Sequence, residues 1–307
     1  MTERTVILSD LHLGRPHSAA RSADALRPLW AGASRLILNG DVVEVHHPDH
    51  WSDAARSLLR LHDMTEEDAV KLVLLSGNHD PYLSERRHLL LGHGSILVTH
   101  GDALHPSVAP WSPAHERLRT AHAAALAAMD TDQSARGALE ARLAASQHAS
   151  LAEWTDEEAV RAEANRGTIA GMLLRPWMPL LVLRYWAVFP RLAAQFLEEH
   201  VPDARFIVIG HSHRAGIWHF GERTVINTGC YGFPGHPRAV ILEGNTLEVR
   251  RVQRDGERYV LADRPLAEFT LDLADADDAT SPLTLPTPTP GPTAESTADP
   301  TTRSIAS

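Results

Sequence analysis

The sequence predicts an α/β fold, and three observations support this prediction. Short apolar runs of the kind that form buried strands recur along the 307 residues. Several of these runs end in a glycine or another turn residue that is followed by Asp, Asn or His, so polar side chains gather at strand ends. Helix-like stretches separate the early runs, and a block with little strand pattern, residues 104–200, precedes the later ones.

The N-terminal part alternates predicted strands and helices. A strand at residues 5–8 is followed by a helix-like stretch at 22–33 and by a second strand at 35–38. A helix is predicted at 52–62. Residues 65–68, Thr-Glu-Glu-Asp, resemble a capping box, which predicts that a separate short helix opens there.

Further apolar runs extend the strand pattern to residue 252. Strands are predicted at 72–75, 96–98 and 205–209. Shorter runs then alternate with glycine-containing turns, which predicts a second layer of strands. These runs are 216–219, 224–226, 239–242 and 247–252.

Five of the predicted strand ends carry Asp, Asn or His, which are residue types that commonly bind divalent metal ions. Because ligands collect at the carboxyl ends of strands in α/β sheets, we expect these side chains to lie together. Carboxylate, imidazole and amide oxygen suit Mn, Fe, Zn, Co or Mg, and no thiolate is offered at these positions. The side chains, in chain order, are Asp10 and His12, Asp41, Asn78, His100, and His211 and His213.

These ligands are numerous enough for two metal ions, with Asp41 as a bridge between them. The first set would be Asp10, His12 and one histidine of the last motif, and the second set would be Asn78, His100 and the other histidine. Two ions roughly 3.5–4 Å apart suit in-line attack on phosphorus by a hydroxide that they generate from water. His79 would donate to a phosphoryl oxygen or protonate the leaving oxygen.

The motifs resemble those of the calcineurin-like metallophosphoesterase superfamily, and all five blocks occur in the family's order. They are Asp10-Leu11-His12, Gly40-Asp41, Gly77-Asn78-His79-Asp80, His100-Gly101 and Gly210-His211-Ser212-His213. The resemblance implies a four-layer α-β-β-α sandwich, two sheets flanked by helices with metals at the strand ends, interrupted here by a helical insertion. It also implies two divalent metal ions as cofactors, with Mn as the first expectation and Fe, Zn, Co or Mg as alternatives.

The resemblance also assigns the ligands and the catalytic histidine. It gives Asp10, His12, Asp41 and His213 to the first metal, and Asp41, Asn78, His100 and His211 to the second. His79 matches the catalytic histidine of the family, and either Glu44 or Asp80 is expected to orient it.

Two departures from the family bear on the substrate. Phosphoprotein phosphatases of the family have Asp and then Arg where this chain has Glu44 and Val45, which argues against a phosphoprotein substrate. The nearest pattern is that of the UDP-2,3-diacylglucosamine hydrolase branch, which cleaves a pyrophosphate. That branch typically has Arg where this chain has His79. We therefore expect a small-molecule or nucleotide-linked phosphodiester or pyrophosphate, with a nuclease as the runner-up and a non-catalytic scaffold third.

The domain organisation follows from the same patterns. Residues 1–103 and 201–255 are predicted to form the metallophosphoesterase core, and 104–200 a helical cap that acts either as a support or as a substrate lid. The apolar segment around Trp177 and Trp186 contains interspersed Arg and Pro, which interrupt it as a membrane span. It is expected to contact an acyl chain, a membrane surface or a second subunit, with plain core packing as the alternative. Residues 274–307, rich in Pro and Thr, are predicted to be disordered.

The composition bears on nucleic-acid binding and on the cellular compartment of the protein. The net charge of −10 argues against a general nucleic-acid grip, although a local basic groove stays open. The single cysteine, Cys230, forms no internal disulfide, which favours the cytoplasm, with peripheral membrane attachment as an option. Cys230 has no base beside it in the sequence and is not predicted to be a nucleophile.

Overall fold

The computed structural model describes residues 3–15, 20, 22–45, 48–112, 114–129, 134–154, 178–232 and 235–271. Residues Met1–Leu273 form one compact unit. The predicted disordered tail and Trp177 lie outside the described residues.

The first of two sheets has the strand order β11-β10-β9-β1-β2-β3. β1, β2 and β3 are parallel to one another, with Ile7 opposite Ile37 and Ile37 opposite Val73, and β9 runs antiparallel to β1. The carboxyl ends of three strands therefore meet at one edge of this sheet. The strands are β1 (Arg4–Leu8), β2 (Arg35–Asn39), β3 (Lys71–Leu75), β9 (Arg238–Glu243), β10 (Thr246–Asp255) and β11 (Arg258–Thr270).

The second sheet has the strand order β4-β5-β6-β8-β7. β5, β6 and β8 are parallel, and β4 and β7 close the two edges as antiparallel strands. The strands are β4 (His88–Leu91), β5 (Ile96–Thr99), β6 (Phe206–Ile209), β7 (Gly216–Phe220) and β8 (Arg223–Asn227).

The two sheets pack face to face around an apolar core. In β1 and β6 successive side chains point to opposite faces, so Ile7 and Val208 enter the space between the sheets. Their neighbours Val6 and Ile209 point outward to the helix layers. Strands buried on both faces must be apolar at every position, which explains the continuous apolar runs in the sequence.

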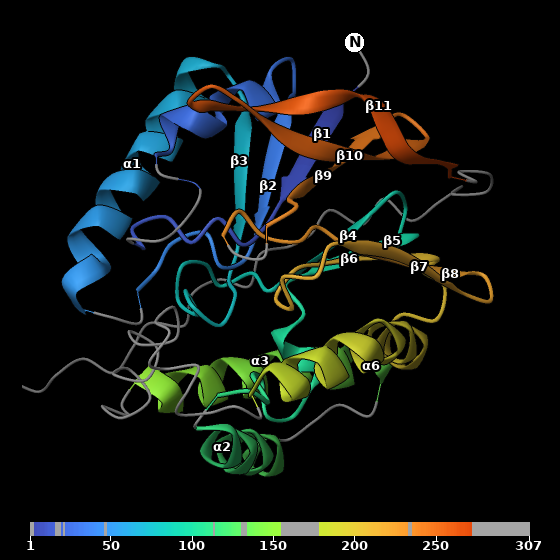
Figure 1. Ribbon diagram of the computed structural model, residues 1–307. Coiled ribbons are helices and arrows are strands. Elements are labelled where there is room, and N and C mark those ends of the chain that lie inside the picture. The colour runs from blue at the N-terminus through green and yellow to red at the C-terminus, as the bar shows by residue number, and fades with distance from the viewer. Residues whose placement is uncertain are drawn as a thin grey trace, which may run out of the picture. The chain divides into compact units, whose positions relative to one another are not determined.

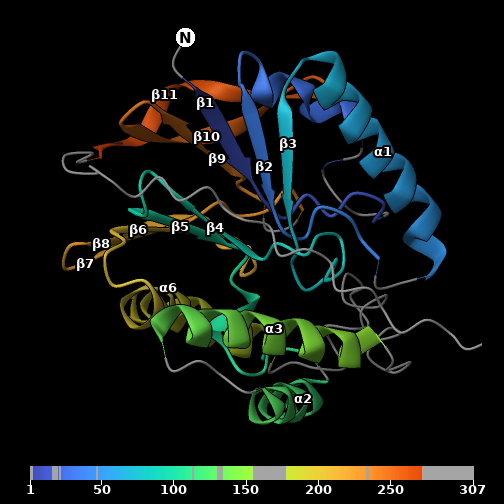
Figure 2. The same cartoon turned by 180° about the vertical axis from the view of Figure 1, so that it is seen from behind.

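Helices cover the outer face of each sheet, as Figures 1 and 2 show. The 3-10 helix η1 (Asp24–Trp30) and helix α1 (Trp51–Glu67) cover the first sheet, with Leu26, Trp30 and Leu61 packed on it. Helices α3 (Ala135–Trp154) and α6 (Met178–His200) cover the second sheet. Helix α2 (His115–Ala128) packs on α3. The predicted four-layer α-β-β-α sandwich is thus confirmed, and the described helices of the insertion supply its fourth layer.

Several local predictions were wrong. The helix-like stretch at 22–33 is a 3-10 helix because Pro28 lies inside it and removes a backbone donor. Thr65 opens no new helix: it lies within α1, and its hydroxyl donates to the His62 carbonyl at 2.8 Å. Strands β4 and β11 were not predicted, and β11 carries the first sheet to Thr270, beyond residue 255.

Helix α6 is also longer than its prolines suggested. It continues through Pro190, so the apolar segment is not interrupted there. Its stretch Pro179–His200 is, among the described residues, the one helix long and apolar enough to cross a membrane by length and composition. In its most apolar window 39% of the residues are buried, and its inner face packs on the second sheet. A core helix of a soluble domain passes the same test, so no membrane span follows from it.

Candidate metal centre

All seven predicted metal ligands lie just past the carboxyl ends of parallel strands. Asp10 and His12 follow β1, Asp41 follows β2 and Asn78 follows β3 in the first sheet. In the second sheet, His100 follows β5, and His211 and His213 follow β6. The sandwich brings these strand ends together, so ligands that are distant in sequence become neighbours.

We call Asp10, His12 and His213 the first half of this centre. The Nε2 atom of His213 lies 3.3 Å from Asp10 Oδ1 and 3.1 Å from His12 Nε2. The His12 Nε2 atom lies 3.7 Å from Asp41 Oδ2. Two ligand atoms that are each 2.0–2.2 Å from one ion are separated by roughly 3.0–3.5 Å, so the two spacings of His213 fit the edges of a coordination shell, and the spacing between His12 and Asp41 is slightly longer.

We call Asn78, His100 and His211 the second half. His211 Nδ1 lies 2.8 Å from Asn78 Oδ1, and His100 Nε2 lies 3.2 Å from Asp41 Oδ2. The same Asp41 oxygen therefore faces His12 of the first half and His100 of the second half. Asp41 occupies the position between the halves that a bridging carboxylate requires.

Hydrogen bonds leave the correct nitrogen of each second-half imidazole available to a metal. His100 Nδ1 donates to the Asn39 carbonyl at 2.9 Å, which leaves Nε2, 3.2 Å from Asp41 Oδ2, as the nitrogen that a metal would bind once its proton is displaced. His211 Nε2 donates to the Val108 carbonyl at 2.9 Å, which leaves Nδ1. Such bonds fix the tautomer of metal-binding histidines. The donor set thus fits two divalent ions.

Backbone strain is concentrated on the ligands. Five of the seven predicted ligands have positive φ angles, between 46° and 62°, although none of them is glycine. Each such residue costs on the order of 1–3 kcal/mol, and this strain typically clusters at functional sites. The five residues are Asp10, His12, Asp41, His211 and His213.

Glycine is required before two ligands by close approach. A Cβ at Gly77 would meet the Asp41 carboxylate, and a Cβ at Gly210 would meet the carboxylate of Asp10. The Gly-Asn and Gly-His pairs of the sequence therefore allow strand ends from the two sheets to come within ligand distance.

The electrostatics favour a bound cation. Burial disfavours the charged form of His100, but the Asp41 carboxylate raises its pKa to about 10. Burial raises the pKa of the Asp41 carboxyl, but His100, His79 and His12 hold it well below its usual range. Burial lowers the pKa of His211 to about 4, with His100 adding to the shift, so His211 is neutral. An ion bound at Asp41 would displace the His100 proton.

His79 and Glu44 form a pair beside the first half. His79 Nδ1 lies 3.1 Å from Glu44 Oε1, and Glu44 Oε2 lies 3.7 Å from His12 Nδ1. The backbone N–H of His79 donates to Asp41 Oδ1 at 2.9 Å. Glu44 thus contacts both a predicted ligand and the predicted catalytic histidine.

Asp80 has a different environment from Glu44. Its carboxylate accepts backbone N–H groups of Gly77 and Val42 at 2.7 Å and of Asp41 at 3.1 Å. Burial and the charge of Asp41 raise the pKa of Asp80 to about 6. These contacts tie the loop after β2 to the loop after β3, whereas His79 is in contact with Glu44.

Sequence reasoning missed two neighbours of the ligands. Cys230 lies close to His213: burial lowers the pKa of His213, but Cys230 and Asp10 hold it well above its usual range. The Cys230 thiol itself donates to the Gly232 carbonyl at 3.4 Å. Val108, in the predicted cap, supplies the carbonyl for His211. Neither pairing leaves a local sequence signal, because 17 and 103 positions separate the partners.

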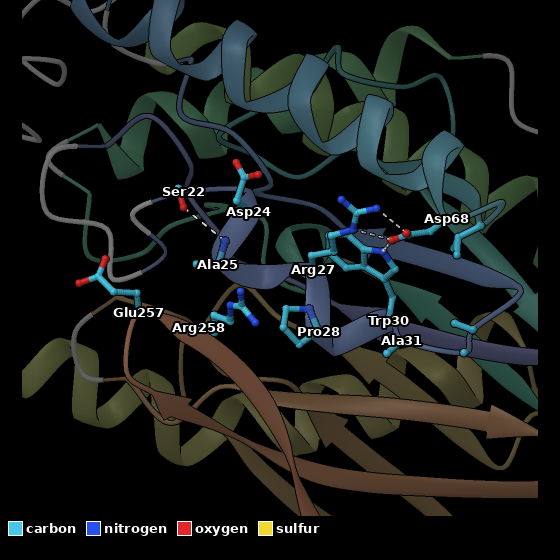
Figure 3. A pocket seen from close by; sticks show the side chains of 13 residues that line it. Ser22, Asp24, Ala25, Arg27, Pro28, Trp30, Ala31, Asp68, Glu257 and Arg258 are labelled. Carbon is cyan, nitrogen blue, oxygen red and sulfur yellow. Dashed lines mark hydrogen bonds and ion pairs between the residues drawn. The ribbon is translucent and has the colours of Figure 1, made fainter.

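A surface pocket lies away from these residues. Its volume is about 670 Å³, and it lies on the outer side of the first sheet among η1, the end of α1 and the turn before β11, as Figure 3 shows. On one side of the pocket Arg27 contacts Asp68 at 2.6 Å, and Trp30 Nε1 donates to Asp68 at 2.9 Å. None of the predicted site residues line it.

Comparison with known proteins identifies the family. The family model for calcineurin-like phosphoesterases matches residues 3–215, and the chain belongs to this family. It is therefore a metallophosphoesterase, and its Asp/His clusters indicate a dinuclear site for divalent metals. A search of curated proteins finds no match.

Solved structures give weaker likenesses. Vacuolar protein sorting 29 from Cryptosporidium parvum is 13% identical with a TM-score of 0.39, covering 88% of this chain and 98% of that one. A predicted phosphoesterase from Streptococcus pneumoniae is 14% identical with a TM-score of 0.35, covering 88% and 98%. A dimetal phosphatase from Danio rerio is 11% identical with a TM-score of 0.41, covering 84% and 98%. Likenesses this low support no conclusion about the function of this chain.

Proposed function

We propose that the chain hydrolyses a small-molecule or nucleotide-linked phosphodiester or pyrophosphate at a centre of two divalent metal ions. The observation that carries the proposal is the position of Asp41 between two complete ligand sets, with the His79–Glu44 pair beside them. When bound, the two ions would lower the pKa of a water molecule and neutralise charge that develops on the phosphoryl oxygens.

The roles of the protein residues follow from their contacts. The Glu44 carboxylate accepts from His79 Nδ1, which leaves His79 Nε2 to carry a proton to the leaving oxygen as its bond to phosphorus breaks. Water supplies the oxygen of the new bond. Asp80 positions Asp41 through backbone hydrogen bonds and touches no reacting atom in this proposal. Mn²⁺ is the ion we propose first, since all seven ligands offer oxygen or imidazole nitrogen.

The substrate class rests on two features. Val45 stands where phosphoprotein phosphatases of the family have Arg, which disfavours a phosphoprotein. The net charge of −10 disfavours nucleic acid, so a nuclease is the second candidate. A scaffold is the third candidate, and the complete ligand set argues against it.

The test is hydrolysis of bis(p-nitrophenyl) phosphate by metal-stripped protein, with Mn, Zn, Mg or no metal restored. We expect turnover only with metal. Asp41→Asn should abolish it, and His79→Ala should lower kcat about 10²–10⁴-fold, the usual contribution of a general acid. Asp63→Asn and His62→Ala, at exposed positions of α1, are the matched controls.

Each alternative predicts its own result. Wild-type turnover in either site variant would overturn the assignment of residues. Metal binding without turnover would favour the scaffold, and turnover of single-stranded DNA faster than of nucleotide-linked pyrophosphates would favour the nuclease.

A lipid surface is part of the proposal, through the outer face of α6. Leu180, Leu181, Leu183 and Val188 are 70%, 44%, 56% and 44% exposed there. Arg184 and Arg191 are exposed on the same helix, so the face combines apolar and basic groups as membrane-surface helices do. We therefore propose a cytoplasmic protein that binds anionic lipid peripherally.

Co-sedimentation with vesicles of phosphatidylserine or phosphatidylcholine tests this surface. The double variant Leu180→Asp, Leu183→Asp should lose binding to the anionic vesicles, whereas Leu59→Asp, at a 64% exposed position of α1, should not. Absence of vesicle binding by the unchanged protein would reject the lipid surface. A dimer that the double variant dissociates would assign the face to a second copy of the chain.

A further inference from the structure

The segment after η3 (Asp102–Leu104) reaches from the insertion to a ligand of the second half. The Val108 carbonyl accepts the Nε2–H of His211 at 2.9 Å, and both residues are almost fully buried. This bond holds the His211 ring with Nδ1 toward Asn78. A residue of the insertion thus selects the tautomer of a predicted metal ligand.

The backbone at Val108 is held in an unfavourable conformation to make this bond. Its φ is +52°, which a β-branched residue rarely adopts. Its N–H donates to the His105 carbonyl at 2.8 Å, and its side chain packs with Ala114 and Leu118. These contacts within the insertion hold the Val108 carbonyl, which accepts the His211 hydrogen bond, in a fixed position despite the unfavourable backbone conformation.

Other contacts from the insertion reach the same two ligand loops. Trp186 of α6 donates through Nε1 to the Ser212 carbonyl at 2.7 Å, one residue after His211. Ser146 of α3 donates to Asp102 at 2.5 Å, two residues after His100. The rings of Trp111 and Phe189 lie 5.6 and 6.0 Å from the His211 ring.

The first half has different neighbours. The side chains of Asp10, His12 and His213 contact loops at the ends of the sheets. Their neighbours include Ser9, Asp41, Glu44, His79 and the backbone N–H of His211. Trp186 of α6 contacts both residues that flank His213, since it donates to the Ser212 carbonyl and accepts from Arg214. The contact that distinguishes the second half is therefore the bond between the Val108 carbonyl and the His211 ring.

We propose that the helical insertion sets the affinity of the second metal ion through the Val108 carbonyl and His211. This inference rests on the proposed two-metal function. It makes the insertion a control point, since any ligand that shifts residues 105–112 or α6 would change occupancy of the second site.

Two substitutions of Val108 distinguish the effect of moving its carbonyl from the effect of losing its side chain. Val108→Pro removes the N–H and fixes φ near −65°, so the carbonyl must move. Val108→Gly keeps the positive φ accessible and keeps the carbonyl in place. Both variants lose the buried side chain, so Val108→Gly is the control for packing.

The measurement is calorimetric titration of the metal-free full chain with Mn²⁺, with electron paramagnetic resonance to distinguish single ions from coupled pairs. We expect Val108→Pro to weaken the second Mn²⁺ by about 10–100-fold, the usual effect of losing such a supporting hydrogen bond, and to leave the first within about twofold. Val108→Gly should bind both ions as the unchanged protein does. Equal weakening of both ions, or equal behaviour of the two variants, would overturn the inference.

If Val108→Pro does not fold, Trp111→Leu is the second test. It removes the ring that lies 5.6 Å from the His211 ring, so the second ion should weaken by roughly twofold to tenfold and the first should not change. No change in either ion would overturn the inference. An unchanged protein that binds only one Mn²⁺ would instead contradict the two-metal function itself.

Discussion

The two halves of the metal centre have the same number of ligands but differ in charge and in support. The first half contains one carboxylate, Asp10, and two imidazoles, whereas the second half contains the neutral amide of Asn78 and two imidazoles. The first half is supported by loops of the two sheets, and the second half is partly supported by the insertion. Asp41 is shared by both.

This difference predicts an order of metal binding. An ion in the first half faces two carboxylates, Asp10 and Asp41, and an ion in the second half faces only the shared Asp41. Since the attraction between unit charges scales with their number and proximity, the first ion should bind more tightly. The weaker second site is then the one at which small changes in support alter occupancy, and this is where the insertion contacts the centre.

The largest expected effect comes from the residue that the halves share. Asp41→Asn removes one negative charge from both sites. Two unit charges 4 Å apart interact by about 4 kcal/mol at an effective dielectric constant near 20, and Mn²⁺ carries two such charges, so both Mn²⁺ affinities should fall by at least about 10²–10³-fold. Calorimetric titration of the metal-free variant measures both constants. Loss of only one ion would show that Asp41 does not bridge.

A smaller effect, confined to one ion at a time, is expected when the carboxylate is moved from the first half to the second. Asp10→Asn should weaken the first ion by about tenfold to a hundredfold and spare the second, because only the first loses a carboxylate. Asn78→Asp should tighten the second ion, since it gives the second half the same charge as the first. If the order of binding does not change in the double variant Asp10→Asn, Asn78→Asp, then charge is not what distinguishes the halves.

Most of the ligand set could be predicted from the sequence because the chemistry is local to each strand end. β1 and β6 are buried on both faces, so they appear as unbroken apolar runs, and Gly210 is needed where Asp10 approaches. Apolar run, glycine and ligand therefore stand next to each other in the chain. The resemblance to a family supplied the assignment of His211 and His213 to different halves, which the spacing left open.

Two kinds of feature could not be predicted in this way: contacts between loops, and strands at the edge of a sheet. Val108 and Cys230 contact His211 and His213 only after the sandwich has formed, and no periodic pattern connects them. β11 was missed because it is an edge strand with Pro265 and many exposed residues. Thr65 was misread because a capping pattern also fits the interior of a helix, where its hydroxyl bonds back to His62.

The smallest expected effect is a loss of stability at low pH, caused by a buried histidine at the end of α6. His200, the last residue of α6, is 5% exposed. Burial lowers its pKa from 6.5, and Arg142 adds to the shift, while Glu199 opposes it. The unfolded chain therefore binds this proton more readily than the folded chain, so stability is greatest above pH 6.5 and declines as the pH falls below it.

Replacing this histidine should flatten that decline. One such group contributes at most about 1.4 kcal/mol per pH unit, so His200→Leu should lose less stability than the unchanged protein between pH 7 and 5.5. Urea unfolding of the metal-free chain at both values measures the difference, and His62→Leu, at an exposed position of α1, is the control. Because α6 also carries Trp186, which contacts Ser212 between His211 and His213, His200→Leu should retain bound Mn²⁺ better than the unchanged protein at pH 5.5. Identical stability and Mn²⁺ binding of the two proteins at both pH values would show that protonation of His200 does not affect the anchoring of α6.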